Sequence, residues 1–115
     1  MTINNLQDLA RELNALYPTR YNHYDEKQQG TFIVYFDVGE ENFHADDLVY
    51  TEGLLIDIDL YSDHKNLEAE RRIKNMLRSN KIPYDKGDTN YIQAEKLYLT
   101  TFTIKLITRY DENNY

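Results

Sequence analysis

Apolar residues recur at two different spacings along this chain of 115 residues, and the spacing distinguishes helices from strands. Over residues 2–17 they lie three or four positions apart, which places them on one face of a helix. Thr2, Asn4 or Asn5 can cap its start, and Pro18 ends it, because proline disfavours helix in the residue before it. The stripe consists of Ile3, Leu6, Leu9, Ala10, Leu13 and Leu16.

A second helix is predicted over residues 67–80, with Asp63 or Asn66 as its N-cap residue. Acidic residues open this segment and basic residues close it, as the helix dipole favours. Its buried stripe is expected to be Ala69, Ile73, Met76 and Leu77. Two i,i+4 pairs of opposite charge are expected to stabilise it on the solvent side, Glu68–Arg72 and Glu70–Lys74.

Other segments have the composition and alternation of strands. Residues 31–38 are dense in β-branched and aromatic residues and end at Gly39. Residues 54–61 alternate most clearly, with Leu54, Ile56, Ile58 and Leu60 on one face and Leu55, Asp57, Asp59 and Tyr61 on the other. Shorter or less regular strands are predicted over residues 21–24, 81–86, 91–94 and 97–109, the last with Tyr98, Phe102, Ile104 and Leu106 toward the core.

The stretch from residue 40 to residue 53 is acidic and has no clean period, so we predict an extended loop there. Loops of this length in a small domain are usually functional or mobile. It lacks the alternating oxygen ligands of a calcium loop. If its apolar residues are exposed, they favour a contact with a partner. An equally good interpretation is that Phe43 and Val49 fold back on the core. The candidate contact residues are Glu40, Glu41, Asn42, Phe43, His44, Asp46, Asp47 and Tyr50.

The order of elements is helix, strands, helix, strands, with short connections. This order favours a single α+β domain over residues 1–110, with two main helices packed on an antiparallel or mixed sheet. Residues 111–115 are expected to form a polar tail. No internal repeat or linker divides the chain.

Composition narrows the function classes. Asp and Glu number 20 against 13 Lys and Arg, a formal net charge of −7, which is the opposite sign to that of nucleic-acid binders. There is no Cys, hence no disulfide or thiolate site. No stretch reaches the ~20 apolar residues of a membrane span, and the N-terminus lacks a signal-peptide pattern. We therefore expect a cytosolic address.

Candidate chemistry is sparse. The histidines His23, His44 and His64 share no ligand spacing, so a zinc site is not expected. Asp57 and Asp59 lie on one strand face, where they could form a solvated surface, line a channel, or act as a metal-binding or acid–base pair. The first two are preferred, because no His, Lys or Ser clusters with them in sequence. No phosphate loop or nucleophile elbow occurs. We expect no enzyme activity, cofactor or metal.

Tyrosine is unusually frequent, with 11 residues. Tyrosine supplies large amphipathic contact area with few rotatable bonds, so interfaces favour it. It is also a good strand residue, and part of the excess is structural. The composition therefore points to a module for binding or assembly.

Four segments in order resemble the tail-terminator or tail-completion proteins of long-tailed bacteriophages. Residues 24–37 are similar to that family's entry into its sheet. Asn42-Phe-His-Ala-Asp-Asp-Leu-Val-Tyr50 resembles its pattern Asn-Phe-Gly-Ala-Asp-Asn-x-Val-Tyr, with His44 in place of Gly. Ile58-Asp-Leu-Tyr-Ser-Asp-His-Lys-Asn-Leu-Glu68 resembles its strand-to-helix junction, and Tyr91-Ile-Gln-Ala-Glu-Lys-Leu-Tyr98 a later segment. The likeness spans about residues 20–107.

The resemblance implies a virion protein, assembled in the cytoplasm of a bacterial host. Such proteins form a hexameric ring on the head-proximal end of the tail tube, stop its polymerisation and dock the head connector. The implied partners are further copies of the chain, the tail tube protein and the connector or neck protein, with DNA passing through unbound. Asp57 and Asp59, or the segment of residues 40–47, would then face the channel or its rim.

Three alternatives stay open. The chain could be a head-side neck adaptor or stopper, which is also a small ring at the same junction. It could be an acidic binder outside the virion, such as a DNA mimic or an inhibitor of a host enzyme. A small hydrolase has only the two aspartates and the histidines in its favour.

Overall fold

A six-stranded sheet with two helices on one face forms the protein in the computed structural model, which describes residues 3–44 and 49–111. The α+β fold predicted from the sequence, with two helices and a mixed sheet, is confirmed. The elements in chain order are α1 (Leu6–Asn14), β1 (Thr19–Tyr21), β2 (Thr31–His44), β3 (Val49–Ser62), α2 (Leu67–Ser79), β4 (Tyr84–Lys86), β5 (Asn90–Ile92) and β6 (Leu97–Asp111).

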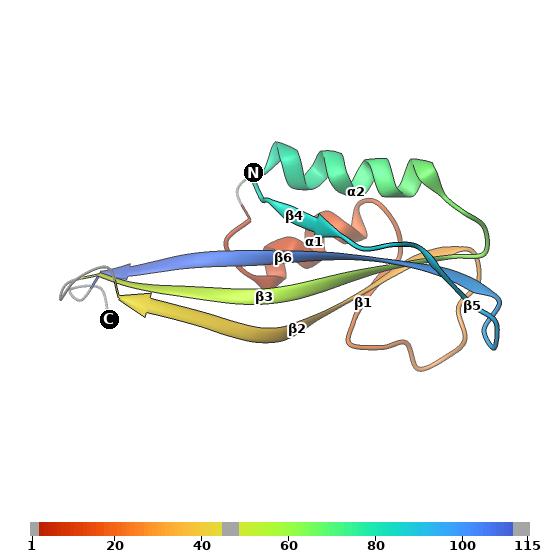
Figure 1. Ribbon diagram of the computed structural model, residues 1–115, viewed down its shortest axis with the longest axis horizontal. Coiled ribbons are helices and arrows are strands. Elements are labelled where there is room, and N and C mark those ends of the chain that lie inside the picture. Colours follow the sequence, from red (N-terminus) through yellow and green to blue (C-terminus); the bar gives the residue numbers. More distant parts are fainter. Residues whose placement is uncertain (1–2, 45–48, 112–115) are drawn as a thin grey trace.

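Three long strands make the frame of the sheet. The strand order is β1-β2-β3-β6-β4, and β5 also pairs with β6. Only β1 and β2 run parallel; the other pairs are antiparallel. In Figure 1 both helices lie over one half of the long strands, and β2, β3 and β6 continue past them. The molecule is therefore elongated, with extents of 51 × 25 × 23 Å.

The main core lies between the helices and the sheet. Leu9 and Leu13 of α1 and Ile73 and Leu77 of α2 are fully buried there, as the predicted stripes require. The sheet supplies the alternate residues of its long strands, Ile33, Tyr35, Ile56, Ile58, Leu60, Phe102, Ile104 and Leu106. Burial of each such aliphatic side chain stabilises the fold by about 1.5–3 kcal/mol. This layer therefore stabilises the half of the sheet that the helices cover.

Asparagine caps both helices. The Asn5 side chain accepts a hydrogen bond of 2.8 Å from the Asp8 amide, and that of Asn66 accepts one of 3.0 Å from the Ala69 amide. α1 is shorter than its apolar pattern indicates, because it begins only after the Asn5 cap and ends at Asn14. The apolar stripe continues past Asn14 into the following turn, so the sequence pattern predicts a longer helix than the structure contains.

The short strands differ from their predicted ranges. The partner predicted over residues 21–24 is β1, which ends at Tyr21 and pairs in parallel with Ile33–Tyr35 of β2. β4 covers only the end of the predicted range 81–86, and β5 lies one residue earlier than predicted at its start. Residues this close to turns carry too little periodicity to fix a boundary.

Glu70 lies at the centre of a polar network between α2 and the sheet, and its predicted pairing with Lys74 is wrong. The residue is 5% exposed. Its carboxylate lies 2.6 Å from Lys65 Nζ and 3.4 Å from Lys86 Nζ of β4. Burial alone would raise the pKa of Glu70, but the Lys65 hydrogen bond and the two lysine charges outweigh burial and lower it. The helix turns this residue inward, which i,i+4 spacing does not reveal.

The network predicts a specific loss of stability in Glu70→Gln. The amide leaves both ammonium groups without their carboxylate, so we expect the free energy of unfolding in urea to fall by about 1–3 kcal/mol. Glu68→Gln is the matched control, because Glu68 is an exposed partner of Arg72 and should change stability by less than about 0.5 kcal/mol.

The pH dependence supplies a further check on Glu70. A folded pKa below 4.5 stabilises the protein above that pH, and the contribution is lost as pH falls through the lowered value. The gap between wild type and Glu70→Gln should therefore shrink on acidification. An unchanged gap from pH 7 to pH 3 would contradict this role.

Candidate functional site: the arm and the open face of the sheet

An arm of three strands projects from the part of the protein covered by the helices. It consists of residues 39–44 of β2, 49–55 of β3 and 105–111 of β6, with Leu54 and Leu106 at its base still packed against the main core (Figure 1). β3 is the middle strand, paired from Gly39↔Leu55 to His44↔Tyr50 on one side and from Leu55↔Lys105 to Val49↔Asp111 on the other. A register shift between Asp37 and Gly39 marks the base of the arm on β2.

The predicted loop over residues 40–53 is wrong, because its described parts are strands of this arm. Residues 40–44 extend β2, and residues 49–53 belong to β3. The candidate contact residues Glu40, Glu41, Asn42, Phe43 and His44 therefore lie along one strand, with Tyr50 opposite His44. Asp46 and Asp47 fall outside the described residues. A ribbon that packs on no helix needs no alternation of apolar residues, so its sequence carries no strand signal.

One ion pair crosses the arm. Lys105 of β6 contacts the carboxylate of Glu41 on β2 and so spans the middle strand. It passes over Gly53, where an added Cβ would lie 2.8 Å from the Glu41 carbonyl oxygen and 3.1 Å from Lys105 Cδ. Gly53, the last residue of the predicted loop, is thus a site of close approach inside a strand.

Asp57 and Asp59 lie on the sheet face opposite the helices, here called the open face. Thr103 donates to Asp57 Oδ1 at 2.8 Å, and Thr101 donates to Asp59 Oδ1 at 2.7 Å. Asp57 is half-buried, whereas Asp59 is only 8% exposed. Burial raises the pKa of Asp59, the Thr101 hydrogen bond lowers it, the Asp57 charge raises it, and the net shift is upward. Ionisation of Asp59 is therefore less favourable in the folded protein than in the unfolded chain.

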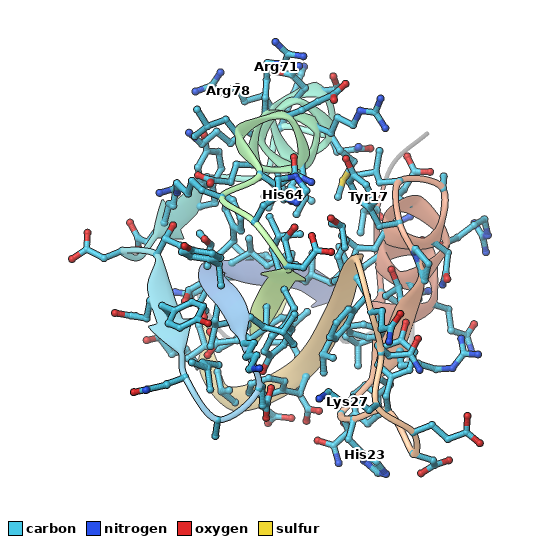
Figure 2. All side chains as sticks on the ribbon, turned by 90° about the vertical axis from the view of Figure 1, so that its right-hand side faces the viewer. Tyr17, His23, Lys27, His64, Arg71 and Arg78 are labelled. Carbon is cyan, nitrogen blue, oxygen red and sulfur yellow. The ribbon has the colours of Figure 1, made fainter. Side chains whose placement is uncertain are left out.

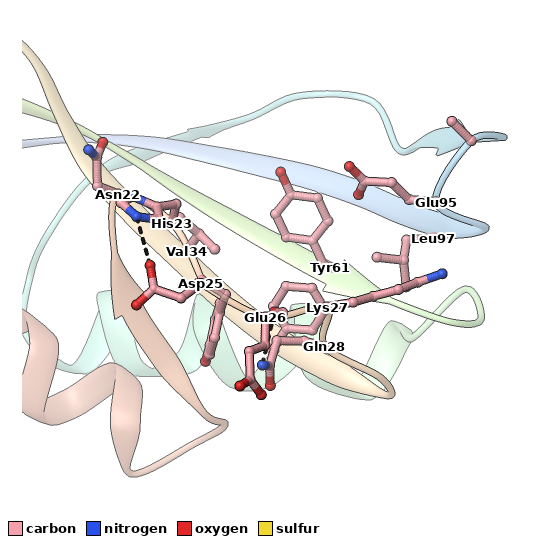
Figure 3. Close-up of a pocket in the computed structure, with 13 residues that line it drawn as sticks. Asn22, His23, Asp25, Glu26, Lys27, Gln28, Val34, Tyr61, Glu95 and Leu97 are labelled. Carbon is pink, nitrogen blue, oxygen red and sulfur yellow. Dashed lines mark hydrogen bonds and ion pairs between the residues drawn. The ribbon is translucent and has the colours of Figure 1, made fainter.

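A second, smaller apolar cluster occupies the other end of the open face. Phe32, Val34 and Leu97 are buried there, with Tyr61 stacked on Phe32 at 5.0 Å between ring centroids. The segment after β1 closes over them and leaves a hollow of about 520 Å³ (Figure 3). The Tyr24 hydroxyl is buried at this hollow and has no hydrogen-bond partner among the described residues. The sequence analysis did not find this hollow, since its lining comes from four separate segments.

The histidines do not gather. His23 pairs with Asp25 at 3.2 Å and His64 with Asp63 at 2.7 Å. Figure 2 shows His23 beside Lys27 on the far side of the sheet from α2, and His64 near the helix layer. Within residues 3–44 and 49–111, no group of three His, Asp or Glu side chains could hold a metal ion. Neither described helix has the length and apolar character of a membrane span.

Tyrosines lie both in the core and at the surface. Tyr35 and Tyr84 pack against the main core. Tyr21 and Tyr91 remain about half exposed, at 48% and 53%. The Tyr21 hydroxyl donates to Asp37, which lowers the pKa of Asp37. Part of the excess is thus structural, and part is available at the surface.

Comparison of the chain with protein-family models gives no match, and comparison with curated proteins gives none either.

Gly53→Ala tests the close approach inside the arm. The new methyl group would push on the Glu41 backbone and on Lys105, so we expect a loss of about 1–3 kcal/mol. Gly39→Ala is the control, since its Cβ would meet only Leu55 Cδ1 at an ordinary 3.6 Å. Urea unfolding measures both, and equal effects at the two glycines would contradict the crossing of Lys105 over Gly53.

Asp59→Asn tests the cost of the buried charge. The raised pKa means that the folded state binds its proton more readily than the unfolded state, so ionisation destabilises the fold above pH 3.8. The variant should unfold at a higher temperature than wild type at pH 7, and the gain should vanish as pH approaches 3.8. Asp57→Asn, at the more exposed position, should gain less. A lower unfolding temperature for Asp59→Asn at pH 7 would refute the interpretation.

Proposed function

We propose that this chain is a structural protein of a long-tailed bacteriophage that forms a hexameric ring at the head-proximal end of the tail tube. The ring ends tube polymerisation and offers a docking surface to the head connector. The proposal rests on the four sequence segments that resemble tail-terminator proteins and on one structural observation, the three-stranded arm. Its activity is binding, with no substrate turned over.

The arm supports an assembly function because contacts within its own chain stabilise it little. Its strands continue beyond the helices, where the two backbone ladders of β3, with β2 and with β6, and the Glu41–Lys105 pair contribute to holding it in place. Exposed surface pairs contribute at most about 1 kcal/mol. An extended ribbon of this kind becomes well packed when neighbouring subunits cover it. All four similar segments also contribute residues to the long strands.

The side chains on the open face are compatible with a position beside DNA. It carries Asp57 together with threonine hydroxyls, and the whole chain has a net charge of −7. A conduit for DNA must avoid the phosphate contacts that Lys and Arg provide. We therefore assign the open face to the channel side of the ring. Asp57 is the more accessible of the two acids proposed to face the channel.

The test is to polymerise the cognate tail tube protein in the presence of this chain. Tubes polymerised with the chain should be shorter and show a ring at one end in electron micrographs, and the isolated ring should have six times the 13.8 kDa protomer mass. A variant in which residues 40–53 are replaced by Asn-Gly removes the β2–β3 part of the arm and should leave tubes uncapped. Circular dichroism checks that its body folds.

Two outcomes would overturn the proposal. If the chain leaves tubes unchanged and purifies with the head connector, it is a head-side adaptor. If it binds neither but competes with DNA for a basic protein, it is a DNA mimic.

A further inference from the structure

The arm has two open edges. β1 covers only Ile33–Tyr35 of β2, so residues 39–44 have no strand on their outer side within the described part of the chain. β5 and β4 cover β6 only as far as Ile104, so the outer side of residues 105–111 is likewise open there. Unpaired strand edges present rows of N–H and C=O groups that template pairing with another chain.

The two edges differ in charge. The edge portion of β2, residues 36–44, contains Asp37, Glu40 and Glu41 and no Lys or Arg. The edge portion of β6, residues 105–111, contains Lys105 and Arg109 against a single acid, Asp111. Opposite charges directly across a strand pair stabilise it, and like charges destabilise it. We therefore expect a β2 edge to pair more favourably with a β6 edge than with a second β2 edge.

Both edges also expose a large aliphatic residue. Val38, at the bulge of β2, is 49% exposed, and Ile107 of β6 is 59% exposed. Beside Ile107 lies a groove of about 450 Å³, lined also by Leu55, Pro83 and Tyr84. The groove opens where β4 begins at Tyr84, because Pro83 before it has no N–H to donate to a ladder. The β6 edge thus offers open backbone groups and a recess whose lining is largely apolar but includes the charged residues Glu41, Asp85 and Lys105.

We propose that the β2 edge of one copy of this chain pairs with the β6 edge of the next, with Val38 of one copy seated by the groove beside Ile107 of the other. The occupant of the groove is therefore a second copy of this chain. The inference deepens the proposed ring by naming the surfaces that build it, and it rests on that proposal for the closure of the assembly.

The geometry of the arm favours a head-to-tail contact. β2 and β6 lie on opposite sides of β3 and are both antiparallel to it, so they run in the same direction. A rotation about an axis along the strands places the β2 edge of one copy beside the β6 edge of its neighbour and leaves both copies one free edge. Such heterologous contacts form rings when the rotation closes. A symmetric dimer would instead bring two acidic or two basic edges together.

Charge reversal on one edge at a time tests the pairing. Val38→Lys/Glu40→Lys shifts the formal charge of the β2 edge by +3, from −3 to zero, and Ile107→Glu/Arg109→Glu shifts that of the β6 edge by −3, from +1 to −2. Glu41 and Lys105 are left unchanged, since their ion pair holds the arm together. Each variant alone should have the mass of one 13.8 kDa protomer by light scattering, whereas the wild type and a 1:1 mixture of the variants should assemble.

The control carries the same kinds of substitution away from both edges. Leu67 is 67% exposed at the start of α2 and is followed by the exposed Glu68. Leu67→Lys/Glu68→Lys therefore matches the first variant in charge and should assemble as wild type does. The edge pairing is overturned if either edge variant keeps the wild-type mass, or if the mixture stays monomeric while both variants show wild-type circular dichroism.

Hydrogen exchange on the wild type gives a second measurement that needs no variant. Above the concentration of assembly, amides in residues 39–44 and 105–111 should exchange at least tenfold more slowly than in the dilute protomer, with little change in α2. Slowing confined to the helices would place the contact elsewhere. A wild type that is monomeric at every concentration overturns edge pairing in solution, while capping of tail tubes still decides the proposed function separately.

Discussion

The structure depends on the position of β3 between β2 and β6. Its backbone is paired on both sides from Tyr50 to Ser62, with one register shift against β2. In the half under the helices, alternate residues of β3 also fill the core. In the other half, the same ladder continues without that support. One continuous central strand therefore joins a conventional packed domain to a projecting arm.

This arrangement explains how the arm forms strands although no helix covers most of it. Backbone hydrogen bonds between strands do not depend on side-chain type, and each contributes about 0.5–1.5 kcal/mol. The arm adds the contact of Lys105 with Glu41, which fits because Gly53 leaves room for it. The half of the three strands under the helices thus holds the core, and the other half is the part that we propose to contact neighbouring molecules.

Both faces of the sheet use buried polar groups, but with different consequences. Under α2, Glu70 has two lysine partners, and its pKa is lowered. On the open face, Asp59 has a threonine hydroxyl and a neighbouring carboxylate, and its pKa is raised. The first group fastens the helix to β4, whereas the second retains an unfavourable charge. Ionised Asp59 thus does not stabilise the fold, and the open face that carries it is the face proposed to line the channel.

The sequence by itself determined the helices, the covered strands and their buried faces, because apolar spacing follows from contact with a core. It also determined the acidic charge and placed Asp57 and Asp59 on one face. Only the tertiary structure decided that residues 40–44 and 49–53 are strands, since an uncovered ribbon leaves no apolar period. The inward position of Glu70, the crossing of Lys105 over Gly53 and the two open edges likewise arise from chain segments far apart in sequence. Local spacing cannot encode which strand ends without a neighbour.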